Sequence, residues 1–350
     1  MNLHVFLQRL RFFLSKKFKQ DHVLKAVVFN KHGIPSEVCQ YVDIDDPGKP
    51  KSNEITVQMR VSAINPADLL AIEGRYPSPP LPTIPGVEGV GIVREIGSKI
   101  SNLSRGDKVL VLSRHNWVEY QNIAADQAIK LPCDIDLQQA AQMKANPPTA
   151  IMLLENYEKL NPGDWVIQNA ANSAVGIHLI RLARLRGIRT VNIVRRAEVF
   201  EEIKSVGGDL VFLDTEELAK KVRYELGNGQ LRLAIDAIGG ESTMSIASCL
   251  STGGTVVNYG YLAGKPCMIT QDQTIVKQIK LVGFWARYGF FDQPHHFIQK
   301  RFDDISNLFL DGTLFSKVDT IYRLDQFKQA LKHAGSAARH GKILLSITRD

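Results

Sequence analysis

Short runs of β-branched and apolar residues, broken by Gly, Pro and Asp, fill the chain from about Lys25 to residue 130. Runs of this kind, bounded by turn residues, are typical of short strands. They are KAVVFN, YVDID, EITVQMRVSAI, VEGVGIVREIG, DKVLVLS and WVEYQNIA. This part of the chain is therefore predicted to form an all-β first domain that ends near residue 130.

After residue 136 the pattern changes to an alternation of strands and helices. A helical run, DLQQAAQMKANPPTAIMLLENY, is interrupted at residues 146–148. Buried strands follow at 165–170, 190–195, 209–214, 232–238, 254–260 and 279–285. Helical patterns separate the first five of these strands, which predicts βαβ units and a doubly wound parallel sheet.

The two patterns predict two domains, as a chain of 350 residues allows. From about residue 293 the chain returns to mixed helix and strand, and its last strand, KILLSI, can pair back onto the first domain. We expect a basic extension at residues 1–24, a β-rich domain formed by 25–145 and 293–350, and an α/β domain at 146–292.

Composition narrows the class of protein. Hydrophobic residues make up 44% and charged residues 23%, as in a soluble globular protein. The net charge is +7, and residues 1–25 carry +5 of it, so the remainder holds only +2 and does not suggest a nucleic-acid-binding body. No apolar run approaches the ~20 residues of a membrane span. The four cysteines form no C-x-x-C pair, which fits a reducing compartment.

The first 20 residues, MNLHVFLQRLRFFLSKKFKQ, mix apolar and basic residues and contain no acid. A mitochondrial transit peptide has this composition, and so does a short basic helix or extension. We therefore expect the mitochondrial matrix if the protein is eukaryotic and this segment is a transit peptide, and the cytoplasm if it is bacterial.

The turn ANSAVG, at residues 171–176, follows the first strand of the α/β domain. Aligned on G-x-G-x-x-G, it keeps glycine only at Gly176, with Ala171 and Ser173 at the other two positions. Small residues still let a pyrophosphate approach the helix N-terminus, so a dinucleotide site is predicted. The alternative is a tight turn without a ligand.

The end of the second strand indicates which dinucleotide binds. An NAD site needs an acidic residue there for the ribose hydroxyl. This chain has Arg195 and Arg196 instead, and no acid before Glu198. Guanidinium groups suit a 2′-phosphate, so NADPH is the predicted cofactor. The alternative is two solvated arginines at a strand end.

The domain order, together with GVEGVGIVREIG and GDKVLVL, resembles the medium-chain dehydrogenase/reductase superfamily across residues 25–350. The resemblance implies a GroES-like β-rich catalytic domain and a Rossmann domain. Zinc members carry a Cys before the first helix and a His in G-H-E, where this chain has Asn65-Pro66 and Val87. The four-cysteine lobe is also missing. Because zinc needs Cys, His or carboxylate ligands, we expect no metal.

Several stretches resemble the mitochondrial-type trans-2-enoyl thioester reductases. They are INPADLLAIEGRYPSPP, VIQNAANSAVG, TVNIVRR, NYGYLAGKP and GFW. The resemblance implies hydride transfer from NADPH to the β-carbon of a 2-enoyl thioester carried by coenzyme A or acyl carrier protein. A strand near 279–285 at the edge of the sheet could pair two copies, so we expect a homodimer.

The same resemblance places the active-site tyrosine on Tyr76. A phenol can donate a hydrogen bond to the thioester oxygen as an enolate develops. The alternative for Tyr76 is a loop aromatic that packs on Pro77 and Pro79. The implied cofactor contacts are Asn146, Asn172, Ser173, Ala174, Val175, Arg195, Arg196, Ala197, Tyr259, Gly260, Tyr261, Leu262, Phe284, Trp285, Ala286 and Lys342.

Two features depart from this family, and two other functions stay open. Ala197 stands where a second arginine is common, and the segment 113–121 is shorter, which changes the rim of the substrate cleft. A zinc-free NADPH quinone oxidoreductase would need little beyond NADPH and a stacking pocket, so Tyr76 would be dispensable. A reductase-like fold without activity could instead bind a protein partner or RNA.

Overall fold

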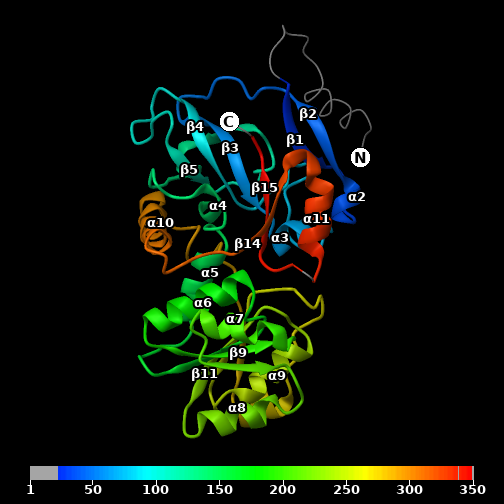
Figure 1. Cartoon of the computed structure of the whole chain (residues 1–350), viewed down its shortest axis with the longest axis vertical. Helices are drawn as coiled ribbons and strands as arrows, with labels where there is room; N and C mark the ends of the chain where they lie inside the picture. Colours follow the sequence, from blue (N-terminus) through cyan, green and yellow to red (C-terminus); the bar gives the residue numbers. More distant parts are fainter. Residues whose placement is uncertain (1–22, 338, 349–350) are drawn as a thin grey trace. The chain divides into compact units, whose positions relative to one another are not determined.

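The computed structural model describes residues 23–337 and 339–348, and the chain divides into two compact units (Figure 1). Unit 1 consists of Met1–Lys144, Pro294–Asp311 and Ser316–Asp350, and unit 2 of Ala145–Gln293 and Gly312–Phe315. Residues 1–22, to which the transit-peptide prediction applies, lie outside the described residues.

Unit 1 is built on a seven-stranded sheet and a two-stranded ribbon. The sheet runs in the order β14-β15-β3-β4-β5-β7, with β6 paired to β3 beside this path, while β1 and β2 form the ribbon. The strands are β1 (Leu24–Phe29), β2 (Cys39–Ile44), β3 (Glu54–Ala63), β4 (Gly89–Ile96), β5 (Lys108–Val111), β6 (Tyr120–Ala124), β7 (Ala128–Lys130), β14 (Val318–Arg323) and β15 (Lys342–Ser346). Strand β15 pairs antiparallel with β3, as expected for the last strand.

Helices cover this sheet and close its core, so unit 1 is β-rich but not all-β. The buried core centres on Trp117, Phe29 and Met59, and α11 contributes Phe327 and Leu331. The helices are α2 (Pro35–Val38), α3 (Pro66–Ile72), η1 (Ala125–Gln127), α4 (Leu137–Ala140), α10 (His295–Leu310), η4 (Leu324–Gln326) and α11 (Phe327–Gly335).

Unit 2 is a doubly wound parallel sheet, as the sequence predicts. Its six strands run in the order β10-β9-β8-β11-β12-β13, so the direction of winding reverses between β8 and β11. The strands are β8 (Trp165–Gln168), β9 (Arg189–Val194), β10 (Leu210–Leu213), β11 (Leu231–Asp236), β12 (Thr255–Asn258) and β13 (Lys280–Gly283). The helices are α5 (Asn146–Glu155), α6 (Ala174–Leu185), η2 (Ala197–Val199), α7 (Phe200–Ser205), α8 (Leu218–Leu226), α9 (Glu241–Cys249) and η3 (Asp272–Val276).

The prolines that interrupt the helical pattern mark the start of a helix. Helix α5 begins at Asn146, and Pro147 lies in its first turn. A proline costs little there because the first N–H groups of a helix have no partner within the helix. The run therefore forms two helices, α4 and α5, instead of one.

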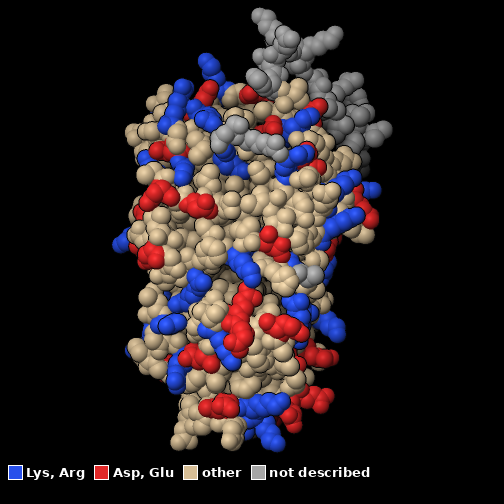
Figure 2. Space-filling view, viewed as in Figure 1, with Lys and Arg blue, Asp and Glu red and all other residues tan. Residues whose placement is uncertain are grey.

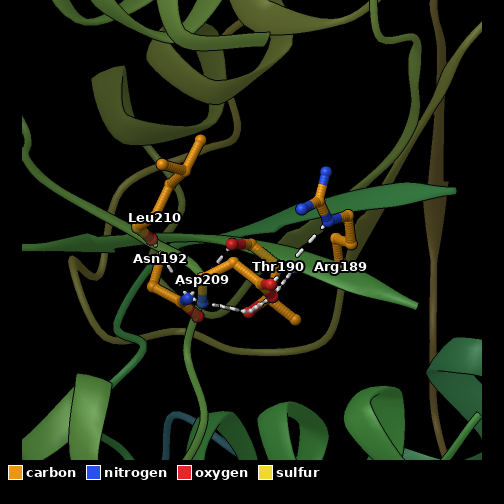
Figure 3. A network of polar contacts seen from close by, with 5 residues as sticks. All are labelled: Arg189, Thr190, Asn192, Asp209 and Leu210. Carbon is orange, nitrogen blue, oxygen red and sulfur yellow. Dashed lines mark hydrogen bonds and ion pairs between the residues drawn. The ribbon is translucent and has the colours of Figure 1, made fainter. Parts of the chain in front are cut away.

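A polar network ties β9 to the start of β10 (Figure 3). Asp209 accepts hydrogen bonds from the backbone N–H of Thr190 at 2.8 Å and from its hydroxyl at 3.4 Å. Asn192 donates to the Thr190 hydroxyl at 2.9 Å and to the Leu210 carbonyl at 3.1 Å. This network fixes β9, at whose carboxyl end the predicted arginine pair lies.

Charged side chains of both signs lie on the face shown in Figure 2, where acidic and basic residues are interspersed over each unit. In the part of the chain that the structure describes, no helix is long and apolar enough to cross a membrane.

Candidate active site

The predicted phosphate-binding turn joins β8 to helix α6. The Ser173 side chain caps α6 and accepts a hydrogen bond from the backbone N–H of Gly176 at 3.2 Å. A Cβ atom at Gly176 would lie 2.4 Å from the carbonyl oxygen of Ala171. Glycine is therefore required for the helix to approach the strand this closely. The turn presents the N-terminus of a 12-residue helix, whose N–H groups and dipole favour an anion.

Most of the predicted cofactor contacts follow strands of the parallel sheet in unit 2. The carboxyl ends of parallel strands lie along one edge, where α/β sheets bind ligands near the reversal of winding. The segments at this edge are 172–175 after β8, 195–197 after β9, 259–262 after β12 and 284–286 after β13. The structure thus brings these four segments to the same edge.

Tyr259 begins the segment after β12, and its backbone N–H donates to the carbonyl of Asp236 at 2.9 Å, which ties this segment to the end of β11. Burial raises the pKa of Tyr259 well above its ordinary value, and the Ser173 side chain acts in the opposite direction. Tyr259 therefore stays a neutral phenol. The next two side chains, Tyr261 and Leu262, are exposed.

The guanidinium groups of Arg195 and Arg196 are exposed at the end of β9. Arg196 is the residue that precedes η2, and Ala197 begins that turn. Two cations on a strand end with no neighbouring acid before Glu198 fit the 2′-phosphate of NADPH.

Asn146, another predicted cofactor contact, is buried and carries an unpaired side-chain nitrogen. It is the first residue of α5, and only 7% of its surface is exposed. Among the described residues, its side-chain nitrogen has no hydrogen-bond partner. A buried donor left unpaired costs about 1–3 kcal/mol, so this nitrogen marks a place where a polar ligand group would bind favourably.

Trp285 is half-buried after β13 and does not belong to the main core. Its ring meets Tyr288 edge to face at 5.6 Å, and the Arg287 guanidinium lies 5.8 Å from its centroid. Phe284 donates its backbone N–H to the carbonyl of Asn258 at 2.9 Å, which fixes the start of this segment.

A buried polar network at the reversal of winding was not predicted from the sequence. Asn169 donates to Asp236 at 2.6 Å, linking the ends of β8 and β11. The same carboxylate accepts from Thr243 at 2.7 Å and Asn258 at 2.9 Å, and from the backbone N–H of Gly239 at 3.1 Å. The only hint of this network in the sequence is Asp236 itself, an acidic residue inside the apolar run RLAIDAI.

In unit 1, Tyr76 lies on the loop that follows α3. Gly74 has a φ of +80°, and a Cβ atom there would lie 2.9 Å from the ring of His32. The backbone N–H of Arg75 donates to the carbonyl of Leu70 at 2.8 Å. The Tyr76 ring is half-buried, and the guanidinium carbon of Arg114 lies 5.7 Å from its centroid.

Lys342, also predicted as a cofactor contact, is buried in unit 1. Its ammonium donates to Asn65, whose amide donates to Glu88 at 2.7 Å. Asp68 accepts backbone hydrogen bonds from Asn65 at 2.8 Å and Val87 at 2.7 Å. Burial raises the pKa of Asp68 to about 6 and lowers the pKa of Lys342 to about 8.

A second buried lysine contacts Val87, the residue that the resemblance places where zinc members carry a His. Lys144 donates to the carbonyl oxygens of Val87, Leu112 and Ser113, and burial lowers its pKa to about 7. The Val87 side chain is aliphatic, and no three His, Cys, Asp or Glu side chains within residues 23–337 and 339–348 are grouped to hold a metal. These residues do not fit a zinc site.

The sequence signal for Lys144 was a lone cation within the apolar run AAQMKANPPTAIML. Asp68 and Glu88 lay inside stretches already quoted for the resemblance, but their burial was not predicted. Arg114 lay in the segment predicted to be short.

Two family models match the chain. Residues 51–132 match the alcohol dehydrogenase GroES-like domain, and residues 174–300 match the zinc-binding dehydrogenase model. Together with the doubly wound sheet, these matches define the medium-chain dehydrogenase/reductase fold, as expected. The second model's name implies zinc, which the residues around Val87 do not fit.

Curated relatives define the family more closely. The mitochondrial enoyl-[acyl-carrier-protein] reductase of Arabidopsis thaliana is 34% identical over 92% of this chain and 88% of its own length. The enzyme of the same name from Xenopus tropicalis is 34% identical over 88% of this chain and 91% of its own. The chain belongs to this enoyl-[acyl-carrier-protein] reductase family, which confirms the resemblance.

Solved structures agree with this fold. A putative NADPH:quinone reductase from Bacillus thuringiensis has a TM-score of 0.86 and 32% identity, covering 93% of this chain and 99% of that one. The complex of Etr1p with NADP and crotonyl-CoA has a TM-score of 0.82 and 26% identity, covering 93% and 100%. The mitochondrial 2-enoyl thioester reductase Etr1p/Etr2p heterodimer from Candida tropicalis has a TM-score of 0.82 and 25% identity, with the same coverage.

Proposed function

We propose that this protein is an NADPH-dependent reductase that converts trans-2-enoyl thioesters of coenzyme A or acyl carrier protein to saturated acyl thioesters. The observation that carries the proposal is the 34% identity to an enoyl-[acyl-carrier-protein] reductase across 92% of the chain. The complex of a related structure with NADP and crotonyl-CoA supports the same cofactor and substrate class.

The carboxyl edge of the sheet in unit 2 is the proposed cofactor site. The start of α6 would hold the pyrophosphate, Arg195 and Arg196 would hold the 2′-phosphate, and Asn146 would offer its unpaired amide donor. Bound NADPH would supply a hydride. Lys342 stays a proposed contact, although its ammonium is already bonded to Asn65.

Tyr76 is the proposed catalytic residue. Addition of a hydride to the β-carbon moves negative charge onto the thioester oxygen, and a hydrogen-bond donor there stabilises the transition state more than the substrate. The phenol can donate that bond, and it can pass a proton to the α-carbon directly or through water. The described residues around Val87 offer no set of metal ligands that would perform this polarisation instead.

The test is an NADPH-oxidation assay with crotonyl-CoA for the wild type and a Tyr76→Phe variant. Loss of one donor to a developing oxyanion lowers kcat roughly 10²–10³-fold in other enzymes, and we expect a comparable loss here. Tyr224→Phe is the matched control, because 84% of Tyr224 is exposed. Unchanged turnover by Tyr76→Phe would contradict the assigned role.

A quinone oxidoreductase is the second candidate, favoured by the 32% identity to the putative quinone reductase. Quinone reduction does not need a donor at Tyr76, so the Tyr76→Phe variant would keep full activity. Assays with enoyl thioesters of several chain lengths and with quinones, under one set of conditions, separate the two reactions by kcat/KM.

We further propose that the protein forms a homodimer. Strand β13 is at the edge of the unit 2 sheet, and its Leu281 is 38% exposed, so two such edges could pair. The heterodimer of a related reductase supports this arrangement. Leu281→Lys should yield monomers by light scattering. In a eukaryotic cell we expect the mitochondrial matrix, and the names of the relatives, which say mitochondrial, support the organelle.

A further inference from the structure

The loop that carries Arg114 is anchored on both sides of this residue. The carbonyl of Ser113 accepts hydrogen bonds from Lys144 at 3.1 Å and from the side chain of Asn116 at 2.9 Å. His115 pairs through its ring nitrogen with the carbonyl of Ile84 at 3.1 Å. Asn116 and Lys144 are buried, so the backbone at Arg114 is held by groups that water cannot easily replace.

The Arg114 side chain itself is directed to one partner. Its guanidinium carbon lies 5.7 Å from the centroid of the Tyr76 ring, within the range of a cation–π contact. Among the described residues, this guanidinium makes no hydrogen bond or ion pair. Both side chains are half-buried, which strengthens such a contact relative to a fully exposed pair.

The surroundings of Arg114 mix polar and apolar groups. A cavity of about 20 Å³ is lined by Arg114 and Asp68, by apolar residues that include Val87, and by Ser78 and Pro79 of the loop that holds Tyr76. The charge of Arg114 favours the ionised form of the Asp68 carboxyl and disfavours the ammonium of Lys144. Attraction to Asp68 therefore favours this position of the guanidinium, whereas repulsion from Lys144 opposes it.

We propose that Arg114 is a positioning residue for Tyr76, and that it holds the phenol ring in the orientation needed to donate a hydrogen bond to the thioester oxygen. This inference rests on the proposed function. A planar cation on the ring face limits rotation and tilting of the ring, and a misplacement of about 1 Å in a reacting group can cost about 100-fold in rate. The cation also draws electron density from the phenol, which makes its O–H a better donor to an anion.

The kinetic test is a double-mutant cycle with Arg114→Met, Arg114→Lys and Tyr76→Phe, assayed with NADPH and crotonyl-CoA. Loss of a cation–π contact of this kind corresponds to a drop in kcat of roughly two- to thirtyfold for Arg114→Met, with KM nearly unchanged. Arg114→Lys should restore part of the rate because it keeps the charge. In the Tyr76→Phe background, Arg114→Met should cause no further loss.

Two kinetic outcomes would overturn the inference. An equal loss in both backgrounds would mean that Arg114 binds the substrate directly through its guanidinium. A wild-type kcat for Arg114→Met would mean that Tyr76 needs no support. Arg105→Met, an exposed arginine of the same unit, is the control and should leave kcat unchanged. Thermal unfolding of each variant checks that a loss of rate does not reflect loss of fold.

A spectroscopic measurement tests the contact without any substrate. With 3-fluorotyrosine incorporated at position 76, the ¹⁹F resonance should shift or broaden on Arg114→Met and stay in place on Arg105→Met. An unmoved resonance overturns the inference. If the resonance moves but Tyr76→Phe retains full turnover of crotonyl-CoA, the contact stands and the proposed role of Tyr76 fails. The two failures are therefore distinguishable.

Discussion

The phosphate-binding turn of unit 2 and the polar cluster around Val87 in unit 1 are built differently. At the sheet edge of unit 2, the phosphate-binding turn depends on backbone geometry: a glycine that lets a helix approach a strand and a serine that caps the helix. In unit 1, the cluster around Val87 depends on charged side chains removed from water, among them Asp68 and Lys144. Close backbone packing limits which residues the turn can accept. In the cluster around Val87, burial of ionisable side chains and their shifted pKa values set the limit.

Gly176→Ala, in the phosphate-binding turn, should cause the largest loss of stability. The new Cβ atom would meet the backbone oxygen of Ala171 at 2.4 Å, and backbone cannot move aside cheaply. We expect a loss of about 3 kcal/mol in stability together with loss of NADPH binding, measured by chemical unfolding and by fluorescence titration. Gly283→Ala is the control, since a Cβ atom at that residue would have no neighbour within 4 Å. Equal stability of both variants would show that shape does not restrict the turn.

Asp236→Asn, which removes a buried carboxylate from unit 2, should cause the next largest loss of stability. The new amide nitrogen would face donors from Asn169, Thr243 or Asn258 that now point at oxygen. Leaving such a buried donor unpaired costs about 1–3 kcal/mol. Urea unfolding measures the loss. A change below about 0.5 kcal/mol, the size typical of a neutral surface substitution, would mean that backbone geometry alone holds this edge together.

The paired substitution of Arg195 and Arg196 by alanine tests cofactor choice. We expect the affinity for NADPH to fall roughly 10–100-fold, because two charge-assisted contacts to a 2′-phosphate are lost. NADH lacks that phosphate, so its affinity should hardly change. Titration calorimetry with both cofactors is the measurement, and an equal loss for NADPH and NADH would refute the assignment.

Lys144→Met tests the pH dependence of stability, and this pH-dependent part should be the smallest of the effects. Burial lowers the pKa of Lys144 from 10.5 to about 7, so the folded state binds fewer protons than the unfolded state between these values. Wild-type stability should therefore rise with pH across this window. The variant lacks this lysine, so between about pH 7 and 9 its unfolding free energy should increase by up to about 2 kcal/mol less than that of the wild type.

Lys342 and Asp68 also contribute to the pH dependence of stability. The lowered pKa of Lys342 makes stability rise with pH between about pH 8 and 10.5, and this contribution remains in the Lys144→Met variant. Asp68 acts oppositely: its pKa is raised from 3.8 to about 6, so stability should fall as pH rises through that range. Urea unfolding at a series of pH values separates these windows, and an identical slope from about pH 7 to 9 in variant and wild type would contradict the buried ammonium.

Much of the fold was predictable because it follows from periodicity. The six strands of the parallel sheet stand close to their predicted positions, since long apolar runs in an α/β chain leave few other solutions. The turn at Ser173 and the arginine pair were also visible, because each follows a strand directly. The role of Tyr76 came from the family resemblance and stays a proposal, since a tyrosine beside prolines has no unique local meaning.

The sequence by itself determined the strand–helix alternation of unit 2, the basic residues at the end of β9 and the aliphatic residue at the metal position. Only the tertiary structure decided which distant groups meet: Lys144 with the carbonyl of Val87, Lys342 with Asn65, and Arg114 with Tyr76. The physical reason is that periodicity is local, whereas burial of a charge and its pKa depend on groups that approach from other parts of the chain.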